Sequence, residues 1–335
     1  MRCAILGASG LVGRRMLDLL AERDWLGAPP RLLTSARSAG ARLPFGRGEL
    51  VCEEVGPDSF RGVDIALFSA GGGPSRQWGP VAAAHGCWVV DNSSAWRMDP
   101  ATPLVVPEIN GDLVPRAREA RTGGIIANPN CSTIQVAMAL APLARTFGLR
   151  EVQVTTLQAV SGGGQGTVAE YTAQRNGAAP APDGPFPRGI AANVVPAIGA
   201  ALEDGSYEEE AKVARELRKI LGRGADLRVS CTATRVPVVT GHSAAVRVVC
   251  DGPVDLVRAA DVLAAFPGVV VARDPHAYAT PLEAAGGNDV HVGRLRRDPD
   301  EPRALLLWVV ADNLLKGAAW NAAQIADLLA GRGGA

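Results

Sequence analysis

The chain lacks a surplus of charge of either sign and is poor in lysine. Its 335 residues carry 34 basic and 34 acidic side chains, and the only lysines are Lys212, Lys219 and Lys316. Proteins that bind nucleic acid or a membrane surface normally carry a basic surplus. We therefore expect neither kind of partner, and each lysine stands out in a chain with 31 arginines.

The chain also lacks the cysteine patterns of metal sites and disulfide scaffolds. Its six cysteines are scattered, with no C-x-x-C pair and no cluster with histidine, so no metal is predicted. The first residues do not resemble a signal peptide, because Gly7 to Gly10 interrupts the apolar run at once. No apolar stretch approaches about 18 residues, the length of a transmembrane helix. These patterns predict a cytoplasmic protein in a reducing compartment.

Apolar side chains are abundant, at 47% of the residues, and the length predicts about two domains. In the first 130 residues, short apolar runs alternate with amphipathic stretches, a pattern typical of a doubly wound parallel α/β sheet. After Ser132, longer strands alternate polar and apolar residues, which predicts an antiparallel sheet covered on one face. We expect a long loop over 176–189 and a final helix from Leu314 to Leu329.

A glycine-rich turn, GASGLVG over residues 7–13, lies between the first expected strand and the first expected helix. Glycines there allow a tight turn and let the backbone approach a pyrophosphate at the helix N-terminus. The spacing G-x-x-G-x-x-G also fits an ordinary strand-to-helix turn. Its position at the start of an α/β unit favours a dinucleotide site.

The end of the second expected strand bears on which dinucleotide is bound. NAD-preferring sites usually carry an acidic residue there, whereas this chain has Arg37 and Ser38. These two side chains could hold a 2′-phosphate, so the sequence favours NADP over NAD. The alternative is that Arg37 is an ordinary exposed loop arginine.

Cys131 is the candidate nucleophile. It follows the turn Asn128-Pro129-Asn130 and falls in the first turn of the next expected helix. A helix N-terminus stabilises a thiolate, and its free N–H groups, with the Asn130 amide, could stabilise an oxyanion. The alternative, a buried structural cysteine, fits this polar setting poorly.

A nucleophilic thiol needs a base, and the chain has four histidines. His242 follows Gly241 on an expected turn before a strand, a place from which a side chain can reach a site in a second domain. This position favours His242, and sequence alone leaves His291 open.

Nine motifs that occur in order along nearly the whole chain match one protein family. They are GASGLVG, TSARS, DNSSAWRMD, VPEIN, ANPNCSTIQ, LQAVSGGGQG, RVPVVTGHS, TPLEAAG and ADNLLKGAAWNA. Together they resemble the bacterial aspartate-β-semialdehyde dehydrogenases. The resemblance implies a Rossmann-type NADP-binding domain over 1–130, an α+β catalytic and dimerisation domain over 131–313, and a C-terminal helix over 314–335 that returns to the first domain.

The resemblance also implies an activity. It is NADP-dependent reductive dephosphorylation of 4-phospho-L-aspartate to L-aspartate 4-semialdehyde and phosphate, through a thioacyl intermediate on cysteine. Such an enzyme serves diaminopimelate, lysine, methionine, threonine and isoleucine biosynthesis. Its partners are these small substrates, without nucleic acid or membrane, and family members are typically homodimers or homotetramers.

The same resemblance assigns roles around the reacting carbon. Cys131 matches the nucleophile, His242 matches the general acid/base, and Gln158 matches the residue that orients the substrate. Arg235 matches the arginine that binds the substrate α-carboxylate. Asn130 matches a contact to phosphate.

Two further charged positions match phosphate ligands, Arg97 and Lys212. Glu209, three residues before Lys212, matches the acid that meets the substrate amino group. Because Glu208, Glu209 and Glu210 are consecutive, this assignment can be wrong by one position. The alternative for the whole segment is a solvated helix face with an ion pair.

The positions that match the family's NADP site lie in several loops. They are Gly7, Ser9, Gly10, Leu11, Val12, Arg37, Ser38, Ser161, Gly162 and Asn313. The loop from Ser161 to Gly164 is flexible enough to close over the nicotinamide. The chain departs from the family at Gly163, where many relatives carry alanine, and by an extra glycine within 71–73; neither removes a reactive group.

Two rival interpretations remain. N-acetyl-γ-glutamyl-phosphate reductase shares the cofactor fold, the cysteine and the acyl-phosphate chemistry, but the segment with Lys212, together with Arg97 and Arg235, favours the aspartyl enzyme. A catalytically silent paralogue is the other rival. The joint presence of Cys131 and His242, with Gln158 and Arg235, argues against it.

Overall fold

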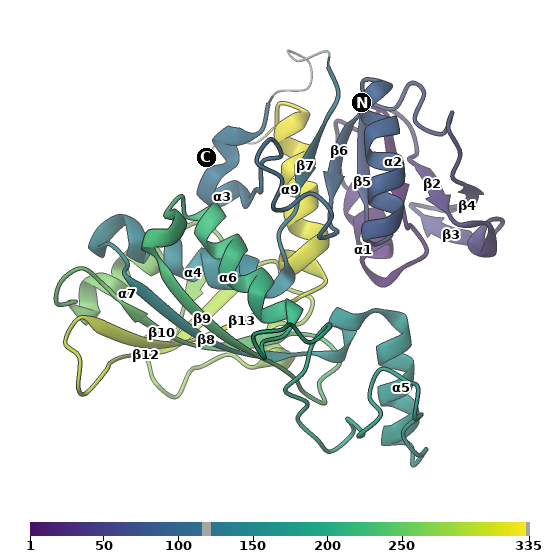
Figure 1. Ribbon diagram of the computed structural model, residues 1–335. Coiled ribbons are helices and arrows are strands. Elements are labelled where there is room, and N and C mark those ends of the chain that lie inside the picture. Colours follow the sequence, from purple (N-terminus) through teal and green to yellow (C-terminus); the bar gives the residue numbers. More distant parts are fainter. Residues whose placement is uncertain (116–121, 333–335) are drawn as a thin grey trace. The chain divides into compact units, whose positions relative to one another are not determined.

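The computed structural model describes residues 1–115 and 122–332 (Figure 1). By its internal contacts the chain forms two compact units: residues 1–130 with the C-terminal segment from Ala318 onward, and residues Cys131–Gly317. The last three residues of the helix expected over 314–335 lie outside the described residues.

The first unit is built on a seven-stranded sheet with the order β3-β4-β2-β1-β5-β6-β7. All its neighbouring strands are parallel except the antiparallel pair β3 and β4. The strands are β1 (Cys3–Leu6), β2 (Arg31–Thr34), β3 (Arg42–Phe45), β4 (Gly48–Glu54), β5 (Ile65–Phe68), β6 (Trp88–Asp91) and β7 (Gly124–Ala127). Every residue of β1 and β5 is buried, as expected for parallel strands covered on both faces.

The helices of the first unit cover the two faces of this sheet. They are α1 (Leu11–Leu20), α2 (Gly72–Ala84), α3 (Pro107–Asn110) and α9 (Trp320–Leu329), with 3-10 turns η1 (Ala36–Ser38) and η2 (Gly111–Leu113). Strand order reverses between β1 and β5, so right-handed crossovers place α1 and α2 on opposite faces. Helix α9 packs beside α1 and against β5 and β6. The C-terminal helix thus belongs to the core of the first unit.

The second unit contains a six-stranded mixed sheet with the order β11-β12-β13-β10-β8-β9. Its strands are β8 (Glu151–Gln158), β9 (Arg228–Arg235), β10 (His242–Val249), β11 (Val269–Val271), β12 (Val290–Arg297) and β13 (Ala304–Ala311). The prediction of a purely antiparallel sheet is wrong, because β8–β9 and β11–β12 are parallel pairs. The alternation of polar and apolar residues reports which face is covered and does not depend on strand direction.

One face of this second sheet is covered by helices, as Figure 1 shows for α4, α6 and α7. The helices and turns of the unit are α4 (Cys131–Phe147), α5 (Gln165–Arg175), α6 (Glu208–Ile220), α7 (Leu256–Ala264), α8 (Pro281–Ala284), η3 (Val160–Gly163), η4 (Gly224–Asp226) and the π-helix η5 (Leu315–Ala319). Along β8 the side chains of Val152, Val154, Thr156 and Gln158 are buried, whereas Gln153 and Thr155 are exposed. The prediction of a sheet covered on one face is confirmed.

Three local features differ from the prediction or complete it. The β3–β4 hairpin was not predicted, since most of its residues are exposed and its apolar pattern is weak. The helix expected from Leu314 to Leu329 begins with the π-helix η5 before α9, and the loop expected over 176–189 has no helix or strand. Among the residues described, no helix is long and apolar enough to span a membrane.

Candidate active site

Cys131 is the first residue of α4, at the end of the chain segment that leaves β7. A helix N-terminus favours negative charge, so it stabilises a thiolate there. Gly317 lies against this residue: a Cβ on Gly317 would come within 3.0 Å of the Cys131 Cβ. Gly317 sits in the π-helix η5, and its N–H donates to Asp312 O at 3.0 Å, five residues earlier. The π-turn therefore brings a residue without a side chain next to the cysteine.

Gln158, Arg235 and His242 lie at one end of the second sheet. Gln158 and Arg235 end the parallel strands β8 and β9 in register, and His242 begins the antiparallel strand β10. Each of the three side chains is buried, and strand alternation places them on the face that the helices cover. The sheet topology thus brings together three side chains that are far apart in sequence.

Arg235 is held by two acceptors at this end of the sheet. Its Nη1 donates to Ala159 O at 2.8 Å and to Gln158 Oε1 at 3.5 Å. Burial lowers the pKa of the Arg235 guanidinium, and negative charge on Cys131 and Glu209 opposes that shift. Cys131 and Glu209 are therefore close enough to Arg235 to interact with its charge.

Gln158 lies between this cation and an acid. Its Nε2 donates to Glu209 Oε1 at 3.1 Å and to Thr156 Oγ1 at 3.2 Å, while its Oε1 accepts from Arg235. Its amide oxygen therefore faces the guanidinium and its amide nitrogen faces the carboxylate. Only this orientation gives each amide atom a complementary neighbour.

The three consecutive glutamates of α6 have different surroundings. Glu209 is buried, at 7% exposure. Glu208 forms a partly exposed ion pair with Lys212 at 3.5 Å, one turn along the helix. Glu210 accepts from the backbone N–H groups of Tyr207 and Ala233. Of the three acids, Glu209 is the one that contacts Gln158. Lys212 forms the ion pair that the alternative interpretation expected, although the pair is only partly exposed.

His242 is completely buried, and one neighbour fixes its tautomer. The Ala159 N–H donates to Nδ1 at 3.0 Å, so the neutral ring carries its proton on Nε2. Burial, and then the charge of Arg235, hold the pKa of His242 well below 6.5. Nε2 has no hydrogen-bond partner in the described part of the chain. A Cβ on Gly162 would lie 2.9 Å from that nitrogen, so only glycine fits beside it.

Asn313 connects the loop with Ser161 to the turn before His242. Its Nδ2 donates to Ser161 Oγ at 2.9 Å, and its Oδ1 accepts from the Gly241 N–H at 2.9 Å. Gly241 has φ +97°, and a Cβ there would come within 2.8 Å of Pro281. One buried amide thus holds two loops that flank the histidine. His291, the rival base, pairs with Val310 in the row of Ser243, on the opposite face of the sheet from His242.

The predicted phosphate ligands Arg97 and Asn130 are both buried residues of the first unit. Arg97 donates through Nε to Asn128 O and through Nη2 to Asn92 O, each at 2.9 Å. Two backbone carbonyls therefore fix the plane of its guanidinium. Lys212 lies in the second unit and, as described above, pairs with Glu208.

The glycine-rich turn of the first unit is too tight for side chains. Gly7 has φ +89°, and a Cβ on it would lie 2.4 Å from Ser69 O. A Cβ on Gly13 would lie 2.2 Å from Gly7 O. Gly10 precedes α1 without a side-chain cap, which leaves the start of α1 to bind an anion. These features fit a dinucleotide pyrophosphate at the switch point between β1 and β5.

The remaining predicted cofactor residues surround that turn or lie in the second unit. Ser9, Leu11 and Val12 are half-buried at the start of α1. Arg37 is exposed in η1, directly after β2, with Ser38 half-buried beside it. This is the position at which a side chain can reach a ribose 2′-substituent. Ser161, Gly162 and Asn313 belong to the second unit, around His242.

Sequence reasoning missed several buried polar residues. Asn128 and Asn321 lie inside recognised motifs, but nothing in their spacing distinguishes them from neighbouring polar residues. Gln135, one turn after Cys131 on α4, is 1% exposed, and within the described residues its amide has no hydrogen-bond partner. The available signal for Gln135 was a glutamine between the apolar residues Ile134 and Val136.

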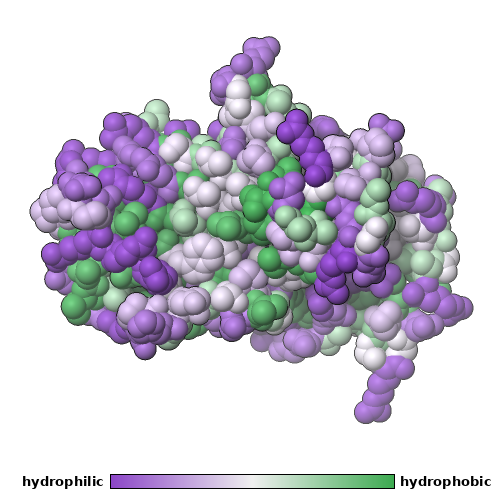
Figure 2. All heavy atoms as spheres, turned by 90° about the horizontal axis from the view of Figure 1, so that it is seen from below, coloured by the Kyte–Doolittle hydropathy of each residue, from purple (hydrophilic) through white to green (hydrophobic). Residues whose placement is uncertain are grey.

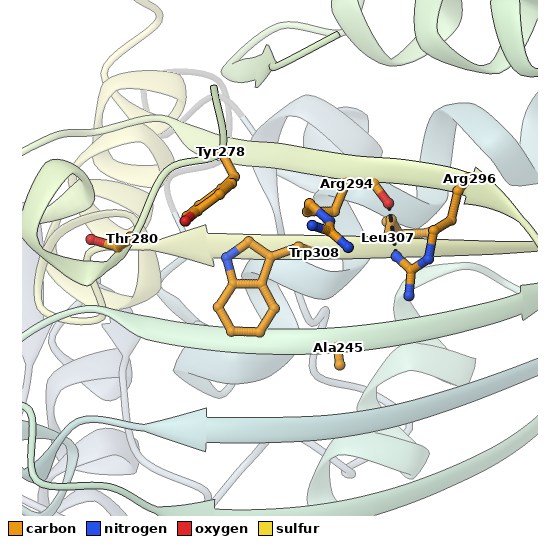
Figure 3. A pocket seen from close by; sticks show the side chains of 7 residues that line it. All are labelled: Ala245, Tyr278, Thr280, Arg294, Arg296, Leu307 and Trp308. Atoms are coloured by element: carbon orange, nitrogen blue, oxygen red, sulfur yellow. Dashed lines mark hydrogen bonds between the residues drawn. The ribbon is translucent and has the colours of Figure 1, made fainter. Parts of the chain in front are cut away.

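A cavity of about 360 Å³ lies on the other face of the second sheet (Figure 3). Tyr278 and Trp308 line one end, and Arg294 and Arg296 of β12 line the other. Trp308 pairs with Ala245, which points away from the helix-covered face. Figure 2, which views the molecule from below, shows hydrophobic patches among hydrophilic side chains. This cavity is separate from the group around His242.

The fold and these side chains are those of an oxidoreductase with a dinucleotide-binding domain. Residues 2–117 match the family described as semialdehyde dehydrogenase, NAD binding domain, and residues 140–316 match semialdehyde dehydrogenase, dimerisation domain. The chain belongs to the aspartate-semialdehyde dehydrogenases within this family, as the following relatives show.

Relatives of this chain share its full length. It is 43% identical to the aspartate-semialdehyde dehydrogenase of Aquifex aeolicus, over 99% of this chain and 98% of that protein. It is 44% identical to that of Bacillus subtilis, over 98% and 97%. A solved structure of aspartate semialdehyde dehydrogenase II from Vibrio cholerae, complexed with ASA, has a TM-score of 0.91 and 40% identity, over 98% of this chain and 97% of that chain. The predicted family, fold class, enzyme class and nicotinamide-dinucleotide cofactor are confirmed.

Proposed function

We propose that this protein catalyses NADP-dependent reductive dephosphorylation of 4-phospho-L-aspartate to L-aspartate 4-semialdehyde and phosphate. The observation that carries this proposal is the buried series of Arg235, Gln158 and Glu209. It offers a cation and an anion on either side of one amide, which suits the α-carboxylate and α-ammonium of an unmodified amino acid. An N-acetylated substrate has no charge for Glu209 to meet.

In this reaction Cys131 forms and breaks the covalent bond. Its thiolate attacks the acyl carbon of the acyl phosphate, the C–O bond to phosphate breaks, and a thioester and inorganic phosphate result. NADPH, when bound, supplies the hydride that reduces the thioester. The carbon–sulfur bond then breaks, releasing the aldehyde and returning the thiolate. The place of Cys131 at the start of α4 supports this role.

His242 acts as the acid that protonates oxygen in the reductive direction. Its proton is on Nε2, because Nδ1 accepts from Ala159. The tetrahedral oxygen formed on reduction would take that proton, and collapse to the carbonyl would return it. In the opposite direction the same nitrogen accepts the proton of the thiohemiacetal. The glycine at position 162 supports this role, because a Cβ there would press against Nε2.

Phosphate binding is proposed for Arg97, Asn130 and Lys212. Arg97 is pre-oriented by two backbone carbonyls, and Asn130 directly precedes the nucleophile. Lys212, half-buried on α6, adds a cation. A planar guanidinium suits the oxygen atoms of a phosphoryl group.

For the cofactor, we propose that residues 1–130 with the C-terminal helix form the dinucleotide-binding domain. Gly7, Ser9, Gly10, Leu11 and Val12 would hold the pyrophosphate, and the tight glycine contacts support this. Arg37 and Ser38 would hold the 2′-phosphate of NADP. In the catalytic domain, residues 131–313, Ser161, Gly162 and Asn313 would contact the nicotinamide end.

We propose a homodimer, or a tetramer of such dimers, formed through the open face of the second sheet. The family description of residues 140–316 as a dimerisation domain supports this, as does the half-buried Trp308 on that face. Sedimentation equilibrium tests it, since Trp308→Arg would yield monomers.

The six free cysteines support the predicted reducing, cytoplasmic setting. The activity would serve biosynthesis of lysine, methionine, threonine and isoleucine.

The deciding experiment measures NADPH formation from aspartate semialdehyde, phosphate and NADP, with NAD in parallel. We expect turnover that requires phosphate and prefers NADP. Equal or faster turnover of N-acetylglutamate semialdehyde would overturn the substrate assignment. Cys131→Ser should abolish turnover while NADPH still binds; a Cys131→Ser protein of near-normal activity contradicts the thioester.

A further inference from the structure

A buried network of three asparagine amides connects the C-terminal helix to the turn that precedes Cys131. Asn321 of α9 donates through Nδ2 to Asn128 Oδ1 at 2.7 Å and to Val105 O at 3.0 Å. Asn128 in turn donates through Nδ2 to Asn92 Oδ1 at 2.7 Å and to Ala318 O at 3.3 Å. Asn321 and Asn128 are both completely buried. All these residues belong to the first unit.

The network allows only one orientation of its amides. Both hydrogens of the Asn321 amide nitrogen point at oxygen atoms, and so do both hydrogens of the Asn128 amide nitrogen. Turning either amide by 180° would set an oxygen against two acceptors. A buried polar group left in that state is costly. Asn321 therefore fixes the orientation of Asn128.

Asn128 and Asn92 also hold Arg97 through their backbone carbonyls. The Asn128 carbonyl accepts from Arg97 Nε, and the Asn92 carbonyl accepts from Arg97 Nη2. The Asn128 N–H donates to Asp91 O at 2.8 Å, which continues the register of β6 and β7. The same two asparagines thus fix each other through their side chains and fix the guanidinium through their backbones.

We propose that Asn321 is a positioning residue for phosphate: it acts through Asn128 on the Arg97 guanidinium and on the Asn128-Pro129-Asn130 turn that leads into Cys131. This inference rests on the proposed function only in taking Arg97 and Asn130 as phosphate ligands. Asn321 itself is not a phosphate ligand in this proposal.

The test uses inorganic phosphate and the reactivity of Cys131, so it does not depend on turnover. Iodoacetate alkylates Cys131, and the phosphate concentration that halves the alkylation rate measures phosphate binding. Asn321→Asp keeps the shape of the side chain but replaces its donors with a carboxylate that faces two acceptors. We expect the protecting phosphate concentration to rise about tenfold, the change that roughly 1.4 kcal/mol produces.

A second variant acts from the other end of the network. Asn92→Ala removes the oxygen that accepts from Asn128 Nδ2, and its half-buried site makes loss of folding a smaller risk. We expect a rise in the protecting phosphate concentration in the same direction. Where Asn321→Asp does not fold, this variant decides the question.

Asp327→Ala is the matched control in the same helix. Asp327 accepts from Arg23 and from Trp25 Nε1, so its loss loosens α9 without removing an amide of the network. We expect lower thermal stability with unchanged phosphate protection. An unchanged phosphate concentration in folded Asn321→Asp and Asn92→Ala, or an equal rise in Asp327→Ala, overturns the proposal.

The assay separates this proposal from the proposed function. If phosphate protects the wild type but the wild type does not turn over aspartate semialdehyde, the substrate assignment is wrong. The comparison of variants then still tests the positioning role of Asn321. Absence of phosphate protection in the wild type would overturn the positioning role, because there would be no phosphate site to position. With active protein, the KM for phosphate should rise in Asn321→Asp while the KM values for semialdehyde and NADP stay constant.

Discussion

Gln158 donates to Glu209 at 3.1 Å, so the last residue of β8 orients a buried acid on α6. This contact distinguishes Glu209 from Glu208 and Glu210, which sequence reasoning could not separate. Glu209→Gln should lower kcat/KM for aspartate semialdehyde by about tenfold to a hundredfold, since a hydrogen bond to a charged group contributes roughly 1.5–3 kcal/mol. Steady-state kinetics measure this. Glu208→Gln is the control, and an equal loss in it would contradict the assignment.

Lys212 has two competing roles that mutation can separate. Its ion pair with Glu208 is partly exposed and contributes about 0–1 kcal/mol to stability. Glu208→Gln breaks this pair and keeps the lysine, whereas Lys212→Met removes the cation as well. We expect only Lys212→Met to raise the KM for phosphate, by about tenfold. Identical behaviour of the two variants would reduce Lys212 to a helix-surface residue.

The buried His242 should make stability depend on pH. Its pKa lies well below 6.5 in the folded protein, so in acid the unfolded chain binds a proton that the folded one does not. The free energy of unfolding therefore has its full value above about pH 6.5 and decreases as pH falls towards the lowered pKa of His242.

Thermal unfolding at about pH 5 and about pH 7.5 tests this prediction. His242→Asn keeps an oxygen that can accept from the Ala159 N–H but does not titrate. Its unfolding midpoint should change less between the two pH values than that of the wild type. An equal change in both proteins would contradict the prediction.

Arg37 should determine the preference for NADP. It is exposed after β2, where it can meet a 2′-phosphate. Arg37→Ala should lower kcat/KM with NADP by about tenfold or more and leave the value with NAD unchanged. Arg42→Ala, which removes an exposed arginine from the nearby strand β3, is the control. Parallel losses with NAD and NADP would indicate a general effect on the fold.

Gly317 should be required for the placement of Cys131. A Cβ on Gly317 would come within 3.0 Å of the Cys131 Cβ and 3.3 Å of its Cα, so Gly317→Ala must displace the cysteine by a few tenths of an ångström. We expect kcat to fall about tenfold, because small displacements of reacting groups are costly. The rate of alkylation by iodoacetamide should also change. Gly252→Ala, where a Cβ meets no atom within 4 Å, should behave as wild type.

The parts of the fold that sequence predicted are those with a distinct apolar pattern. Strands β1 and β5 are continuous apolar runs, and the first part of β8, Glu151 to Thr155, alternates polar and apolar residues, so burial on two faces or one could be foreseen. The β3–β4 hairpin carries mostly exposed side chains and gave no such pattern. The parallel pairing of β8 with β9 joins segments about seventy residues apart, and alternation carries no information on strand direction.

The candidate site was predictable where local context is unusual. Cys131 stands out because it follows Asn-Pro-Asn in a polar segment at a helix start. The choice between His242 and His291 depends on sheet register, which puts them on opposite faces. Asn321 could not be found from sequence, since its partner Asn128 precedes it by 193 residues. Pairings over such distances exist only in the folded chain.

The position of α9 also determines when the first unit can finish folding during translation. Residues 1–130 emerge first. Yet Asp327, which accepts hydrogen bonds from Arg23 and Trp25, and Asn321, which donates one to Asn128, are synthesised only at the end. During translation the second unit is therefore synthesised while the first still lacks a helix of its core. The nucleotide-binding half is the first to be made and the last to be completed, and premature termination anywhere before α9 leaves it unfinished.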